Sequence, residues 1–119
     1  MTEHESKVQS DMIKNVHKYG GYIYKNAQNM YTEKGRPDLT ACIPTTFKAL
    51  TELFGDREIG VFLGLEVKRD KDIYDASKAQ EIVGRKIKKA KGLWFVIDDP
   101  NIVEALMINL TKYNKEVTE

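Results

Sequence analysis

The sequence predicts an α/β fold in which a mixed β-sheet is flanked by helices. Segments with apolar residues at helical spacing alternate along the chain with short β-rich segments. Of the 119 residues, 41% are hydrophobic and 31% are charged, which is the balance of a globular protein with one core. The longest apolar run, 93–97, is far shorter than the roughly 20 residues that a membrane span needs. We therefore expect a single domain over residues 1–119.

Three elements are predicted before Pro44. A helix over 3–19 is indicated by apolar residues at spacings of four and three, and two glycines follow it. The short β-rich segment 22–24 favours a strand. A polar loop then leads through the turn 35–38 into a second strand over 39–43, which the proline ends.

The middle of the chain is predicted to hold a helix, a strand and another helix. Apolar residues at helical spacing indicate a short amphipathic helix over 47–54. The segment 60–68 alternates between two faces, as a strand does. Over 76–90, apolar residues recur at i, i+4, i+8 and i+11, which indicates a helix that Gly92 follows.

A strand and a helix complete the predicted order. The unbroken apolar run 93–97 has the length of a strand buried on both faces, so Trp94 and Phe95 are expected in the core. A turn over 98–101 precedes a helix over 102–113 that carries one apolar face.

Charge and cysteine content exclude some classes of function. The net charge is +1, from 19 basic and 18 acidic residues, which is no general signal for nucleic-acid binding. The basic residues are concentrated over 85–91, which fits either a phosphate-binding surface or a solvated helix face. Cys42 is the only cysteine, so an internal disulfide and a cysteine-based zinc site are excluded, and a reducing cytoplasm is expected. The polar, acidic N-terminus predicts no secretory signal.

Two strand-borne carboxylates can form a cation site if their strands are neighbours. Glu66 and Lys68 share one face of the predicted strand, about 6.7 Å apart, and Asp38 immediately precedes strand 39–43. Asp38, Glu66 and the Val67 backbone carbonyl would then suit Mg²⁺, which accepts one or two carboxylates. The tripeptide Glu-x-Lys is expected about once by chance in this composition. An exposed, salt-bridged strand face is therefore the alternative interpretation.

Three motifs in this order resemble a known nuclease family. They are Gly35-Arg36-Pro37-Asp38-Leu39, Leu65-Glu66-Val67-Lys68 and Ser77-Lys78-Ala79-Gln80. Together they are similar to the virus-type replication-repair nuclease domain (VRR-NUC) of the PD-(D/E)XK nuclease superfamily, over about residues 5–103. The resemblance implies a restriction-endonuclease-like core and metal-dependent hydrolysis of DNA phosphodiester bonds. Stand-alone members of this kind occur in phages and prophages, which implies action in bacterial cytoplasm.

The resemblance implies a role for each matching residue. Asp38 and Glu66 would hold Mg²⁺ or Mn²⁺, and Lys68 would orient or activate the attacking water. Gln80 would lie near the bound water or the scissile phosphate. Helical spacing independently predicts that Gln80 faces the sheet, with a buried core amide as the alternative interpretation.

The first helix and the basic residues supply further candidates. Glu5, four residues before Gln9, matches the N-terminal glutamate of the family, with Glu3 as the alternative. Macrodipole stabilisation by acidic residues at a helix start would explain Glu5 equally well. The two histidines are expected on the surface. The candidate substrate-binding residues are all basic; they are Lys34, Arg36, Arg85, Lys86 and Lys89.

Substrate and assembly follow from the resemblance alone. Stand-alone members resemble Holliday-junction resolvases, which implies branched DNA and a C₂ homodimer with helices 47–54 and 102–113 as candidate interface elements. The segment 44–59 departs from the tight hairpin of small family members; it can cover the core, contact a second copy or meet substrate. Two alternatives stay open, namely a monomeric flap- or nick-cutting nuclease and a non-catalytic nucleic-acid-binding module of this fold.

Overall fold

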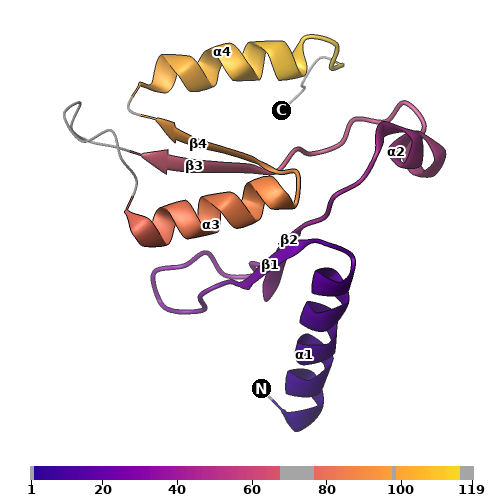
Figure 1. Cartoon of the computed structure of the whole chain (residues 1–119), viewed down its shortest axis with the longest axis vertical. Coiled ribbons are helices and arrows are strands. Elements are labelled where there is room, and N and C mark those ends of the chain that lie inside the picture. Colours follow the sequence, from indigo (N-terminus) through magenta and orange to yellow (C-terminus); the bar gives the residue numbers. More distant parts are fainter. Residues whose placement is uncertain (1, 68–76, 98, 116–119) are drawn as a thin grey trace.

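The chain is mixed α/β in a computed structural model that describes residues 2–67, 77–97 and 99–115 (Figure 1). The elements are, in order, α1 (Glu3–Lys18), β1 (Tyr22–Lys25), β2 (Leu39–Cys42), α2 (Phe47–Phe54), β3 (Leu63–Val67), α3 (Lys78–Lys89), β4 (Leu93–Ile97) and α4 (Pro100–Thr111). This confirms the predicted order of helices and strands. The expected ends of the 60–68 strand and the 76–90 helix, at Lys68 and Ala76, lie outside the described residues.

Capping side chains set where the helices begin. Each described helix follows a residue whose side chain accepts a backbone N–H of the first turn; these residues are Thr2, Thr46, Ser77 and Asp99. The Asp99 cap starts α4 at Pro100, two residues before the predicted start. The local sequence therefore determines the helix boundaries more closely than apolar periodicity does.

The described strands form two separate two-stranded sheets, so the prediction of one mixed sheet is wrong for this part of the chain. β1 and β2 are antiparallel, with Tyr22 opposite Cys42, and β3 and β4 are parallel, with Leu63 opposite Leu93. β2 and β3 are not paired, so the condition for a shared Asp38–Glu66 site on neighbouring strands is not met. Instead, the end of β2 packs on the turn after α3, where the Cys42 Sγ lies 3.7 Å from the Ala90 carbonyl oxygen. The long 43–62 connection carries the chain away before β3 begins (Figure 1).

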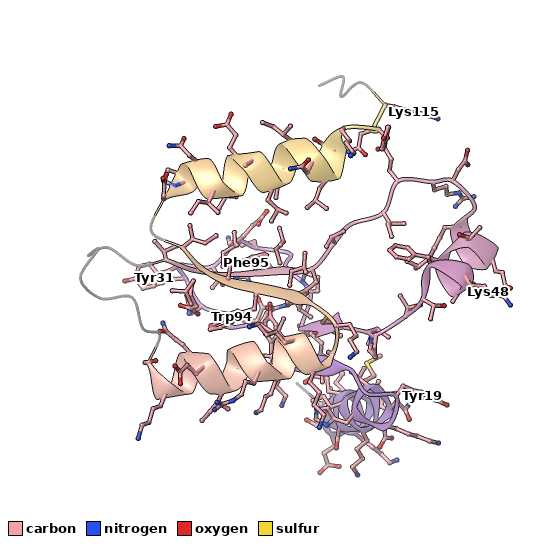
Figure 2. The ribbon with its side chains drawn as sticks, turned by 45° about the horizontal axis from the view of Figure 1, so that its top comes forward. Tyr19, Tyr31, Lys48, Trp94, Phe95 and Lys115 are labelled. Carbon is pink, nitrogen blue, oxygen red and sulfur yellow. The ribbon has the colours of Figure 1, made fainter. Side chains whose placement is uncertain are left out.

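The core lies where α3 meets the sheets. The buried hydrophobic residues among those described are Cys42, Ile87, Ala90 and Ile97. Figure 2 shows Trp94 on the α3 side of the β3–β4 sheet and Phe95 on the α4 side. Both rings are only half-buried, so the prediction that β4 is buried on both faces holds only for Ile97. Gly84 permits the close contact with α3, because a Cβ there would lie 2.6 Å from the Trp94 ring.

The chain is more open than a compact monomer of its size. Its radius of gyration is 17.0 Å, against about 13.5 Å for a compact domain of this length. Its accessible surface is 10367 Å², against about 6,600 Å² for a typical monomer of this mass. Helix α2 projects from the remainder of the structure (Figure 1), and Phe47 on it is 88% exposed. The 44–59 segment therefore does not cover the core of its own chain. None of the described helices has the length and apolar character needed to cross a membrane.

Candidate active site

Glu66 and Gln80 meet between β3 and α3. The Gln80 Nε2 group donates a hydrogen bond of 2.7 Å to the Glu66 Oε2 atom, and both residues are half-buried. This contact confirms the prediction that Gln80 faces the sheet. A distance of 2.7 Å is typical of a charge-assisted hydrogen bond, which is stronger than one between neutral groups.

The start of α3 holds the Gln80 side chain in place. Ser77 and Gln80 form a capping box, in which the Ser77 hydroxyl accepts the Gln80 N–H at 3.2 Å. In return, the Gln80 Oε1 atom accepts the Ser77 N–H at 2.9 Å. The amide oxygen is thus bound to the helix start while the amide nitrogen binds the carboxylate. Ser77 belongs to the third motif, but its capping role was not predicted, although the Ser-x-x-Gln spacing is itself a capping signal.

Glu66 lies at the carboxyl end of the parallel β3–β4 pair. It is opposite Val96, and the next residue, Val67, is opposite Ile97. In open α/β sheets, ligands bind outside the carboxyl ends of the strands. Val67 is the last residue of β3, so its backbone carbonyl is at this edge of the sheet. The residue is 75% exposed. Lys68, the predicted water-orienting residue, lies outside the described residues.

The other two candidate carboxylates line a cavity between α1 and the start of β2. This cavity has a volume of about 430 Å³, and its lining includes Glu5, Gln9 and Asp38. The structure therefore brings Glu5 and Asp38 together, and the alternative Glu3 is not among the lining residues. Thr2 orients Glu5, because its hydroxyl donates to the Glu5 Oε1 atom at 3.2 Å. His4 lies on the surface as predicted, yet it also lines this cavity.

Asn26 supports the turn that carries Asp38. Its Nδ2 group donates to the Pro37 carbonyl oxygen and to the Thr40 hydroxyl, both at 2.7 Å. Its backbone N–H donates to the Asp38 carbonyl oxygen at 2.9 Å. From the sequence, Asn26 was predicted only as part of a polar loop, without a role in supporting the Asp38 turn. That role follows only from the strand register, which places Lys25 opposite Leu39.

The structure does not join the two carboxylate groups into one cavity. The Asp38 cavity is lined by neither Glu66 nor Gln80, because β2 and β3 belong to different sheets. Within residues 2–67, 77–97 and 99–115, no group of three or more histidine, cysteine, aspartate or glutamate side chains is arranged to hold a metal. The two groups are therefore two partial sites, one on β2 and α1 and one on β3 and α3.

The donor atoms in both partial sites suit a hard divalent cation. Glu5 and Asp38 supply carboxylates in one of them, and Glu66 supplies a carboxylate beside the Val67 carbonyl in the other. Mg²⁺ is commonly bound through one or two protein carboxylates, with waters and substrate phosphates completing its octahedron. Each partial site thus offers oxygen atoms of the type that Mg²⁺ and the similar Mn²⁺ accept.

The candidate substrate-binding residues are all exposed. In the β1–β2 loop, the Arg36 guanidinium contacts the Asn26 side chain at 3.4 Å, and Lys34 is nearby in sequence. On α3, the exposed basic residues are Arg85, Lys86 and Lys89. Lys86 and Lys89 also line a second cavity, beside Tyr22. Burial, and then the neighbouring Tyr24, raise the pKa of Tyr22.

Comparison of the chain with protein-family models, with curated proteins and with solved structures finds no match.

Proposed function

We propose that the protein is a metal-dependent endonuclease that hydrolyses phosphodiester bonds in branched DNA. The observation that carries this proposal is the 2.7 Å hydrogen bond between Gln80 and Glu66 at the carboxyl end of β3. A neutral amide orients the carboxylate without neutralising it, and Glu66 has no ion pair in the described part of the chain. An oriented carboxylate at the end of a strand is a suitable ligand for a divalent cation.

The chain's own residues divide the work in this proposal. Glu66 with the Val67 carbonyl would hold Mg²⁺ or Mn²⁺ at one partial site, and Asp38 with Glu5 would hold it at the other. When bound, a divalent cation stabilises negative charge on the reacting phosphate and lowers the pKa of a coordinated water. Lys68 orients the attacking water.

Two further residues act by positioning the carboxylates. Gln80 restricts the Glu66 carboxylate to one orientation through its 2.7 Å bond. Asn26 holds the backbone on both sides of Asp38 through the Pro37 and Asp38 carbonyl oxygens. Preorganisation of this kind matters because a shift of about 1 Å in a reacting group can cost roughly a hundredfold in rate.

A second copy of the chain is the partner that the open shape favours. The surface exceeds that of a compact monomer by about 3,800 Å², and apolar side chains such as Phe47 and Leu53 on α2 and Ile108 on α4 are largely exposed. An obligate dimer buries roughly 1,000–2,500 Å² on each protomer, so this excess is sufficient. A C₂ dimer would present two active sites, as paired cuts in a four-way junction require.

The direct test is cleavage of a labelled four-way DNA junction beside a linear duplex with the same arms. Mg²⁺, Mn²⁺ and EDTA are compared for the native chain and for Glu66→Gln, with Glu104→Gln on the exposed face of α4 as the matched control. We expect metal-dependent paired nicks in the junction that Glu66→Gln abolishes and Glu104→Gln retains. Equal cutting of both substrates would contradict the preference for branched DNA. DNA binding without cleavage in either metal would identify a non-catalytic binding module instead.

A further inference from the structure

A second cavity lies between the end of α1, the start of β1 and the last turn of α3. It has a volume of about 480 Å³ and shares no lining residue with the Asp38 cavity. Its lining includes Lys86 and Lys89 of α3, His17 of α1 and the Tyr22 ring of β1. We call these four residues the lysine cavity. Among the described residues that line it, the charged groups are all basic in type and none is a carboxylate.

Local sequence creates this cavity. Lys86 and Lys89 are three residues apart on α3, so they lie on one face of the helix. Gly20 has a φ of 82°, a conformation that favours glycine, and it turns the chain sharply from α1 into β1. A Cβ on Gly21 would lie 2.7 Å from the Val16 Cγ1 atom, so the glycine lets β1 start close against α1. The cavity is therefore a built feature and not a gap between unrelated side chains.

The basic residues of α3 are not equivalent. The Lys88 Nζ atom lies 5.4 Å from the centre of the Trp94 ring and makes a cation–π contact with it. Lys86 and Lys89 instead line the cavity together with a phenol. Because burial raises the pKa of Tyr22, its hydroxyl stays protonated at neutral pH and can donate a hydrogen bond. Two ammonium groups and one hydroxyl donor suit a phosphate oxygen.

The position along α3 relates the cavity to the candidate active site. Lys86 and Lys89 follow Gln80 by six and nine residues, which corresponds to about 9 and 14 Å along the helix axis at 1.5 Å per residue. At 3.6 residues per turn they also lie about 240° and 180° around the helix from Gln80, so the cavity is on a different side of α3 from the Glu66–Gln80 pair. A backbone phosphate bound there is therefore not the phosphate that is cut.

We propose that the lysine cavity binds a DNA backbone phosphate other than the phosphate that is cut. This inference rests on the proposed nuclease function and adds a second contact point for the same substrate. Such a contact positions the duplex and carries no sequence information. It would set the distance from the cut to the nearest anchored phosphate.

Salt-dependent binding tests the contact without any need for catalysis. A fluorescein-labelled 20-base-pair duplex is titrated in EDTA at several NaCl concentrations, with fluorescence anisotropy as the readout. The test variant is Lys86→Gln with Lys89→Gln. The control is Lys48→Gln with Lys112→Gln, which removes the same charge from exposed positions outside α3. Lys48 is on the projecting helix α2 (Figure 2).

We expect the slope of log K against log salt to become shallower by about one to two in the test variant. The control variant should keep the native slope. Equal slopes for native, test and control proteins would overturn the proposal. Equal losses in test and control would also overturn it, because they would indicate a diffuse charge effect. Either result stands even if the chain cuts no DNA.

The position of the contact is tested by removing one phosphate charge at a time. A neutral methylphosphonate is moved along a junction strand on both sides of the cut. In the native protein, we expect KM to rise when the substitution is at one defined position away from the cut, with kcat little changed. The double lysine variant should be insensitive at that position, because the two changes remove one interaction. A native protein equally sensitive at every position would contradict a defined site.

Discussion

Replacement of Gln80 by leucine removes the two hydrogen bonds that its side chain makes with Glu66 and Ser77, while leaving the volume of the side chain nearly unchanged. The bond of 2.7 Å to the Glu66 carboxylate is lost, as is the 2.9 Å bond from the Ser77 N–H. The Ser77 hydroxyl still caps the helix through the Gln80 backbone N–H. A hydrogen bond to a charged group is worth about 1.5–3 kcal/mol and a neutral one about 1 kcal/mol. Because water can reach this half-buried site and replace part of both hydrogen bonds, we expect the free energy of unfolding to fall by about 2 kcal/mol.

This loss converts into a measurable shift in Tm. The unfolding entropy is about 2.1 cal/mol/K per residue, or roughly 0.25 kcal/mol/K for this chain, so 2 kcal/mol corresponds to about 8 °C. Scanning calorimetry at pH 7 measures the shift. The matched control is Gln28→Leu, because the Gln28 amide is exposed and its contact with the Arg36 carbonyl oxygen is 3.4 Å long. We expect that control to change stability by less than about 0.5 kcal/mol.

A second variant at the same position separates geometry from charge. Gln80→Glu keeps an acceptor for the Ser77 N–H but places a second carboxylate against Glu66. Near pH 7 the two negative charges repel; at lower pH the pair takes up a proton and regains a hydrogen bond. The folded variant thus binds more protons than its unfolded chain, so its deficit relative to the native protein should shrink as the pH falls from 7 to about 4.5. A Gln80→Leu shift below about 2 °C, or a Gln80→Glu deficit that does not change with pH, would refute the reasoning.

Four further results are expected. Gly84→Ala should destabilise the fold by about 1–3 kcal/mol and alter Trp94 fluorescence, because the new Cβ would lie 2.6 Å from that ring; a gain in stability from helix propensity alone would contradict this packing. Asn26→Ala should lower kcat with little change in KM, since it loosens the Asp38 turn, and equal loss of DNA affinity in EDTA would show a binding role instead. Phe47→Asp with Leu53→Asp should convert a dimer to a monomer in sedimentation while circular dichroism is unchanged, because both residues are largely exposed in the protomer; Lys48→Asp is the control. Calorimetry should detect Mn²⁺ binding, and Asp38→Ala should weaken it. An unchanged heat of Mn²⁺ binding in that variant would show that Asp38 is not a metal ligand.

The local features of this chain were predictable because their causes are local. The predicted boundaries of 47–54 and 93–97 agree with α2 and β4. α2 begins directly after the Thr46 cap and ends directly before Gly55, which has a φ of 64°. Both signals are therefore adjacent to the helix in sequence. The orientation of Gln80 toward β3 followed from helical periodicity, which depends only on spacing along the chain.

The pairing of the strands was not predictable in the same way. A shared cation site required the strand after Asp38 to neighbour the strand that carries Glu66. The structure instead pairs β2 with β1 and β3 with β4. Pairing depends on contacts between residues that are distant in sequence, and the apolar pattern of each strand is compatible with more than one neighbour.

The sequence by itself determined the order of helices and strands and the chemical type of the candidate site residues, because caps, glycine turns and apolar spacing act within a few residues. Only the tertiary structure decided that Glu66 binds Gln80 while Asp38 shares a cavity with Glu5. It also decided that Asn26 supports the Asp38 turn and that Lys86 and Lys89 join Tyr22 in a separate cavity. These contacts depend on how β1 pairs with β2 and where α3 packs, and the free energy of that packing is spread over residues far apart in the chain.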